Sequence, residues 1–260
     1  MPITTDHIMP VFFIGHGDPM NALRDNAFTR SLAAMGKSLT VKPKAIMVVS
    51  AHWLTRGTYV ATTAKPETIY DFGGFPEELY RVVFPAPGAP DVAKEVMKLS
   101  SEVKPDAEWG LDHGAWTVLK HMFPAADIPT FQLSIDYFNP MQYHFDLARV
   151  LKPLREQGVL VIGSGNIVHN LREFFSNPSG DPFDWAVEFD KWVKEKIEKR
   201  DFQSLVSYES EGAAAKLAVP TVDHYVPMLY SLALADEKEP ITFTYEEVQS
   251  SISMRCFRVG

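Results

Sequence analysis

Four short apolar runs, separated by helical patterns, limit the possible folds of this chain more than any other feature. The runs span residues 9–14, 45–50, 128–135 and 159–162. Each is bounded by glycine or polar residues, which is typical of a buried β-strand. Between and after them we expect helices over residues 26–37, 90–101, 115–123, 139–157, 181–200 and 227–235. Pro153 lies inside the fourth helix and should kink or split it.

Strands that alternate with helices predict an α/β fold, with a central, mostly parallel or mixed sheet and helices on both faces. Two further strands, at 241–245 and 252–259, end the chain and favour a mixed sheet. No linker divides the sequence, so we expect one catalytic domain over residues 1–260.

Composition excludes several classes of protein. The chain has 260 residues and a formal net charge of −8, without the basic stripe of a nucleic-acid-binding protein. No stretch approaches the roughly 18 apolar residues of a membrane span, so we expect no membrane partner. The one cysteine, Cys256, excludes an internal disulfide and fits a reducing, cytoplasmic location. The oligomeric state does not follow from the sequence.

Two histidines stand out by their position, because His16 and His52 each follow an expected buried strand. In open α/β sheets, ligands bind beyond the carboxyl ends of the strands. Imidazole is also the commonest metal ligand in proteins and suits zinc or iron. Position alone leaves two interpretations open: a shared metal site, or two side chains that form hydrogen bonds at the strand ends.

Three more histidines are candidates, and each also has an ordinary structural explanation. His169 follows the fourth apolar run and its turn, GSGN at 163–166, whose glycines allow a close backbone approach. His224 precedes the helix that contains Pro227, and His113 lies in a glycine-flanked turn before another helix. They could be metal ligands or catalytic imidazoles, or could only connect and cap these elements. His121 and His144 lie within expected helices, where packing or surface roles are favoured.

Several well-known catalytic motifs are absent. The sequence has no G-x-S-x-G, G-x-G-x-x-G, P-loop or H-E-x-x-H motif. A serine hydrolase, a nucleotide-dependent enzyme and a helix-based zinc protease therefore have no positive support.

The histidines belong to a longer series of motifs that spans nearly the whole chain. These are FIGHGDPM at 13–20, VSAHW at 49–53, YDFGGFP at 70–76, WGLDHGAW at 109–116, QLSI at 132–135, GSGN at 163–166 with HNL at 169–171, and HY at 224–225 with Pro227. In this order they resemble the 4,5-DOPA extradiol dioxygenase family, class III ring-cleavage enzymes related to the catalytic subunit of protocatechuate 4,5-dioxygenase.

The resemblance implies that the chain opens the ring of a catechol such as DOPA with molecular oxygen. It also implies a single metal ion held by His16, His52 and His224, with His169 as a fourth ligand or an adjacent base. We assign His169 the role of base, and His113 that of a supporting acid or oxyanion contact. An imidazole, with an ordinary pKa of about 6.5, suits both tasks.

The metal and the activity each have alternatives. Fe(II) is expected for ring cleavage, while an all-histidine site would also hold Zn(II), which lies above Fe(II) in the general affinity order. The same ligands on zinc could serve an amidase-like hydrolase, and a closed site would suit a non-enzymatic metal-binding protein. Phe72 and Phe75 could form an aromatic loop over the site, or an ordinary packed turn.

Overall fold

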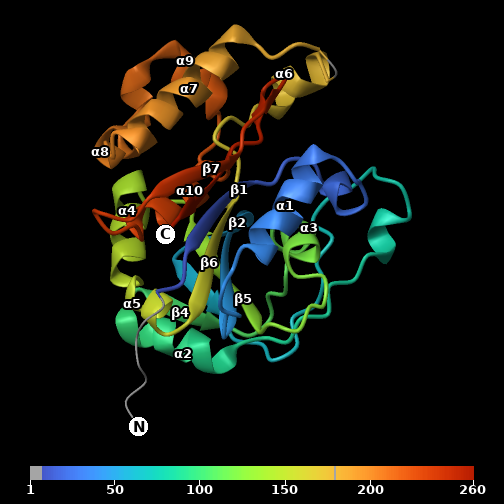
Figure 1. The fold of residues 1–260 in the computed structure, drawn as a ribbon, viewed down its shortest axis with the longest axis vertical. Coiled ribbons are helices and arrows are strands. Elements are labelled where there is room, and N and C mark those ends of the chain that lie inside the picture. The colour runs from blue at the N-terminus through green and yellow to red at the C-terminus, as the bar shows by residue number, and fades with distance from the viewer. Residues whose placement is uncertain (1–7, 179) are drawn as a thin grey trace.

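The computed structural model describes residues 8–178 and 180–260, and an eight-stranded sheet runs through its centre (Figure 1). The strand order is β4-β3-β5-β2-β6-β1-β10-β7. The strands are β1 (Val11–Gly15), β2 (Ala45–Thr55), β3 (Thr58–Ala61), β4 (Val103–Asp106), β5 (Thr130–Asp136), β6 (Val159–Gly165), β7 (Ile241–Tyr245) and β10 (Cys256–Val259). A small hairpin, β8 (Val248–Gln249) and β9 (Ile252–Ser253), lies beside it.

The middle of the sheet is parallel, and an antiparallel pair joins it to the strands on each side. Strands β5, β2, β6 and β1 are parallel neighbours, whereas β10 pairs antiparallel with β1 and β7, and β3 pairs antiparallel with β5. Parallel strands direct their carboxyl ends to one edge of the sheet, which is the upper edge in Figure 1. The predicted mixed sheet is therefore confirmed, and the functional candidates lie along that edge.

Helices cover both faces because the strand residues alternate between two hydrophobic cores. Val11 and Phe13 of β1 join one core, while Phe12 and Ile14 join the other. The first core includes side chains of α2 (Pro90–Leu99), α4 (Met141–Val150) and α10 (Val226–Ala233). The second includes those of α1 (Ala27–Lys37) and α3 (His113–Met122). The predicted α/β fold is confirmed by this arrangement.

A group of helices between β6 and α10 forms the upper part of the molecule (Figure 1). It comprises α6 (Leu171–Ser176), α7 (Asp184–Glu198), α8 (Phe202–Val206) and α9 (Ala213–Ala218). A buried ion pair between Asp190 of α7 and Arg255, just before β10, joins these helices to the sheet. No helix in the described part of the chain is long and apolar enough to cross a membrane.

Several of the sequence-based elements need correction. The polar segment 103–106 and the four-residue segment 58–61 form strands that had not been predicted, because they add to an existing sheet. The expected strand 252–259 is broken into β9 and β10. His52 had been expected after a strand, but it lies inside β2, which continues past an irregularity after Val49. Helix α3 had been expected from residue 115, but it begins at His113 because Asp112 caps it. The predicted split at Pro153 is confirmed, with α5 (Pro153–Glu156) following α4.

Candidate metal centre

The five candidate histidines gather at the carboxyl edge of the parallel strands. His16 follows β1 directly, His52 lies near the end of β2, and His224 precedes α10. The ring centroids of His16 and His52 lie 5.0 Å apart, and those of His16 and His224 lie 5.3 Å apart. We call the cluster of His16, His52, His113, His169 and His224 the histidine floor.

Two glycines of β6 allow His224 to reach this cluster. A Cβ on Gly165 would lie 2.1 Å from the carbonyl oxygen of His224, and one on Gly163 would lie 2.2 Å from that of Pro227. The same His224 carbonyl accepts a hydrogen bond from the Asn166 backbone N–H at 2.9 Å. The glycines of the GSGN segment had suggested a close backbone approach. The segment that they approach is the one that carries His224 and Pro227.

The ring nitrogens of three floor residues lie close enough together to share one metal ion. One ligand nitrogen from each of His16, His52 and His224 lies within 4.8 Å of the others. The Nε2 atoms of His16 and His52 are 3.1 Å apart. Two nitrogens bound about 2.0–2.1 Å from one ion lie about 2.9–3.4 Å apart at ordinary coordination angles. Facing lone pairs at this separation repel unless a cation or proton lies between them, so the donor set fits a divalent ion.

Hydrogen bonds at Nδ1 leave Nε2 free to bind a metal in two of these rings. The Ser164 hydroxyl donates to the Gly114 carbonyl, so it accepts a hydrogen bond from His16 Nδ1 at 3.0 Å. The Asp223 carboxylate accepts a hydrogen bond from His224 Nδ1. Such outer partners orient a ligating imidazole and set which nitrogen has the lone pair.

The other two floor residues lie beside the group of three. His113 donates its backbone N–H and its Nδ1 to the two carboxylate oxygens of Asp71, at 2.9 and 2.8 Å. Its ring centroid is 3.8 Å from that of His52. The ring of His169 stacks on His224 at 3.4 Å with an interplanar angle of 9°. The His169 ring therefore lies face to face with that of a candidate ligand. The backbone N–H of His169 donates a hydrogen bond to the Ala218 carbonyl.

Sequence reasoning missed the two carboxylates that support the floor. Asp71 reaches His113 and also lies 3.4 Å from His52 Nδ1, and Asp223 reaches His224. A signal for both was present, since Asp71 belongs to the YDFGGFP motif and Asp223 directly precedes a candidate ligand. Carboxylates that accept from a ligating imidazole are the usual outer partners of histidine metal sites.

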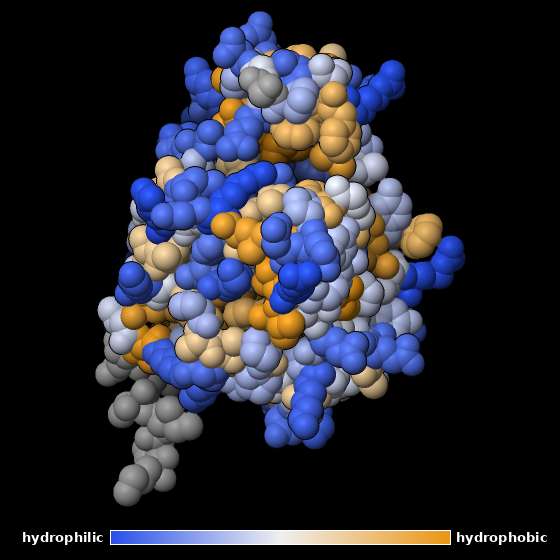
Figure 2. All heavy atoms as spheres, turned by 90° about the vertical axis from the view of Figure 1, so that its right-hand side faces the viewer, coloured by the Kyte–Doolittle hydropathy of each residue, from blue (hydrophilic) through white to orange (hydrophobic). Residues whose placement is uncertain are grey.

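A cavity of about 400 Å³ opens above the floor, a size suited to a small molecule. Its apolar wall, which we call the apolar mouth, consists of Phe72, Phe75, Leu171, Phe174 and Phe175. The first two come from the loop after Tyr70, and the other three from α6. Figure 2 shows hydrophobic side chains where the upper helices meet the body of the molecule. A larger hollow of about 620 Å³ lies by Arg149 and Lys238, and no histidine is among the described residues that line it.

Comparison with known proteins decides the class of this site. Residues 2–255 match the model of the family described as the catalytic LigB subunit of aromatic ring-opening dioxygenase. The chain belongs to this family. It is therefore a metal-dependent dioxygenase of the extradiol ring-cleaving class, as predicted. The zinc hydrolase and the non-enzymatic metal-binding protein gain no support from these matches.

Relatives of this LigB-family chain extend over nearly its whole length. A protein of Escherichia coli strain K12 named 4,5-DOPA dioxygenase extradiol is 44% identical over 97% of this chain and 95% of its own. A protein of Beta vulgaris with the same name is 37% identical over 89% of each. The crystal structure of an uncharacterized protein from E. coli K12 superposes with a TM-score of 0.83, at 42% identity over 97% of this chain and all of that one.

Burial favours the neutral form, which can bind a metal, in four of the five floor imidazoles. Burial, and then the neighbouring His113, lower the pKa of His52 to about 3. Burial also lowers the pKa of His169 to about 4, although the charge of Asp223 opposes this. The pKa values of His16 and His224 fall well below 6.5, first through burial and then through the other histidines. Neutral rings at pH 7 have the lone pairs that a metal needs.

Beneath the floor, a buried carboxylate joins three elements. Asp112 caps α3 and accepts hydrogen bonds from the hydroxyl of Ser50 on β2 at 2.7 Å and the amide of Gln132 on β5 at 2.7 Å. Burial, followed by the charge of Asp71, raises the pKa of Asp112 to about 6. This network fixes the start of α3, and hence His113, against the strand that presents His52.

Proposed function

We propose that the protein opens the ring of a catechol at a single Fe(II) ion held by His16, His52 and His224. The single observation behind the ligand set is the convergence of three ring nitrogens within 4.8 Å. When bound, Fe(II) supplies a redox-active Lewis acid with positions left for the catechol oxygens and for O₂. Zn(II) has no redox chemistry, so zinc in the same site would not support oxygen activation.

His169 is the proposed base that accepts a catechol proton. Its pKa of about 4 keeps it neutral at pH 7, so the ring has a free lone pair. Its position, stacked flat on His224, places it next to the proposed ligands, and Asp223 would stabilise the imidazolium that forms. A general base must be unprotonated and close to the proton that it accepts; His169 is neutral at pH 7 and lies beside the proposed ligands.

His113 is the proposed acid or oxyanion contact. Asp71 holds its Nδ1, so Nε2 is the nitrogen left to face a substrate oxygen. Burial raises the pKa of Asp71, but its hydrogen bonds with His113 outweigh this and hold the pKa below its usual value. The charged carboxylate fixes the orientation of the His113 imidazole.

The substrate is an aromatic ring small enough for the cavity, and we propose a catechol of the DOPA type. The aromatic side chains of the apolar mouth, Phe72 above all, support this assignment. Phe72 contacts the ring of His113 edge-on at 5.5 Å, where a bound aromatic ring would meet both. The relatives from E. coli and Beta vulgaris are named for DOPA.

Anaerobic reconstitution tests the proposal. Metal-free protein receives Fe(II), Zn(II) or no metal, then a panel of catechols that includes DOPA, and finally air. We expect turnover only in the sample that received Fe(II). In that sample, the moles of oxygen consumed should equal the moles of yellow ring-opened product. If no catechol on the panel is opened while one Fe(II) per chain stays bound, the proposed substrate class is wrong; if Zn(II) gives equal turnover, the proposed metal is wrong.

A further inference from the structure

One floor residue differs from the other four in how its ring is held. His16, His113 and His224 each form a hydrogen bond through Nδ1, and Nδ1 of His52 lies 3.4 Å from a carboxylate oxygen. The ring of His169 forms no hydrogen bond with any described residue and contacts the floor by stacking on His224. A stacked ring can slide in its own plane, so the position of the His169 ring depends on the backbone that carries it.

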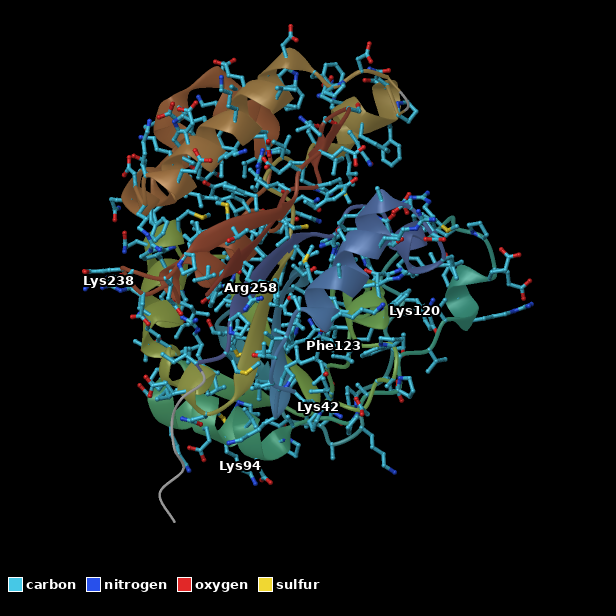
Figure 3. The ribbon with its side chains drawn as sticks, viewed as in Figure 1. Lys42, Lys94, Lys120, Phe123, Lys238 and Arg258 are labelled. Atoms are coloured by element: carbon cyan, nitrogen blue, oxygen red, sulfur yellow. The ribbon has the colours of Figure 1, made fainter. Side chains whose placement is uncertain are left out.

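The small hairpin β8–β9 and the helix α9 hold this backbone. His169 pairs with Ile252 in an isolated antiparallel bridge, and its N–H donates to the Ala218 carbonyl at 2.9 Å. The next N–H, that of Asn170, donates to the Ser251 carbonyl at 3.2 Å. Figure 3 shows the hairpin, drawn in red, rising from the sheet beside α6. The chain segment that carries the proposed base is therefore held between elements from distant parts of the sequence.

Asn170 joins these contacts to the apolar mouth. It is 7% exposed, and its backbone N–H, backbone carbonyl, amide nitrogen and amide oxygen are all bonded. Its amide nitrogen donates to the Leu217 carbonyl of α9 at 2.8 Å, and its amide oxygen caps α6 by accepting from the Glu173 N–H at 3.2 Å. Its own carbonyl accepts from the Ser251 hydroxyl at 2.7 Å. The residue directly after His169 is thus tied to the hairpin, to α9 and to the mouth helix α6.

We propose that Asn170 is a positioning residue for the proton transfer, which it serves by holding the His169 ring within reach of the catechol proton. This inference rests on the role of base proposed above for His169. Positions in an active site are strict, because a misplacement of about 1 Å can cost about a hundredfold in rate. Asparagine suits the position, because its short side chain has one atom that caps α6 and a separate donor for Leu217. The HNL motif at 169–171 therefore contains the base, its positioning residue and the first residue of the mouth helix.

Asn170→Ser tests the positioning role. Serine also caps a helix, but its shorter side chain has no second polar atom for the Leu217 carbonyl. In the Fe(II)-loaded enzyme, we expect kcat for a catechol to fall by about tenfold to a hundredfold, with KM and metal content per chain changed by less than about twofold. The base acts in the chemical step, so its displacement lowers kcat and spares binding.

A double variant separates positioning from a general weakening of the structure. His169→Ala removes the base and should lower kcat by about 100-fold to 10,000-fold. Once the base is absent its position no longer matters, so the addition of Asn170→Ser should lower kcat by less than about twofold more. The positioning role is refuted if the two losses multiply, or if Asn170→Ser alone keeps the kcat of the wild type while His169→Ala loses it.

A matched control is the asparagine that caps α1. Asn26 accepts a hydrogen bond from the Thr29 N–H at 2.9 Å, and it does not line the cavity. Asn26→Ser should leave kcat and KM unchanged. Failure of the proposed function has a different signature. If His169→Ala keeps its full kcat, or if the wild-type enzyme opens no catechol, the proposed base or the proposed reaction is wrong, and the positioning role is refuted with it.

Discussion

The histidine floor and the apolar mouth enclose the same cavity but are built in opposite ways. Every floor residue comes from a strand end or a helix start, and its ring nitrogens or backbone are tied by hydrogen bonds to buried groups such as Ser164 and Ala218. The mouth consists of a loop and a short helix, and its Phe175 is 73% exposed. The contrast indicates that the floor fixes the chemistry while the mouth adjusts to the substrate.

Removal of a floor ligand should have the largest effect. His224→Ala takes away one of the three converging nitrogens, so we expect loss of bound metal and of turnover. Metal affinity and turnover should fall by more than the factor of about 10–100 expected when an outer hydrogen-bond partner is removed. Metal content per chain and oxygen uptake measure both. His121→Ala is the control, because His121 lies on α3 and contacts Asn21 outside the floor. Full metal binding in the His224 variant would contradict the ligand set.

Loss of an outer carboxylate should have the next largest effect. Asp223→Asn keeps an acceptor for His224 Nδ1 but removes the negative charge. We expect metal affinity to fall by about 10–100-fold. Titration against a competing chelator measures the change, and Asp127→Asn, on an exposed pair with Lys42, provides the control. An unchanged metal affinity would show that the hydrogen bond to His224 Nδ1 is sufficient and that the negative charge of Asp223 is not needed.

Two glycines allow a direct comparison of packing in the two regions. A Cβ at Gly165 of the floor would meet the His224 carbonyl oxygen at 2.1 Å, whereas a Cβ at Gly73 of the mouth loop meets nothing within 4 Å. Gly165→Ala should lower the free energy of unfolding by about 1–3 kcal/mol, because the backbone has to shift. Gly73→Ala should change it by less than about 0.5 kcal/mol. Urea unfolding of both variants checks this, and equal losses would remove the distinction.

Truncation of the mouth should have the smallest effect. Phe175→Ala removes an exposed aromatic side chain from the cavity wall. We expect KM for a catechol to rise by about twofold to tenfold, equivalent to one aromatic contact, with metal affinity unchanged. Phe138→Ala is the matched control. It also removes an exposed aromatic ring, which the Arg56 guanidinium covers, but Phe138 does not line the cavity. A loss of metal from the Phe175 variant would mean that the two regions are not separable.

The floor was predictable from the sequence, and the mouth was largely not. Apolar runs that end in histidine indicate a parallel sheet edge, so His16 and His52 could be expected to meet. The position of His224 against β6 depends on Gly163 and Gly165, whose role becomes clear only from the packing of α10 on the sheet. The apolar residues of α6, Leu171, Phe174 and Phe175, have the spacing of one helix face, but this spacing does not say what the face covers. Their place at the cavity depends on how the upper helices pack.

The same limit explains the elements that were missed. The segment VKPD at 103–106 forms β4 although it is polar and contains proline, because β3 offers it an edge to pair with. The carboxyl-terminal chain breaks between Ser253 and Cys256, where Met254 lines the cavity and Arg255 pairs with Asp190. Tertiary contacts override local strand propensity at both places.

The position of β10 between β1 and β7 has a consequence for the order of folding. Strand β1 leads into His16, yet one of its two neighbours in the sheet, β10, is separated from it in sequence by every other strand of that sheet. His224, Ile252 and Met254 also reach the cavity from segments that come long after His16 and His52 in the sequence. A fragment that stops before these segments therefore has no complete site in which to hold a reactive ion.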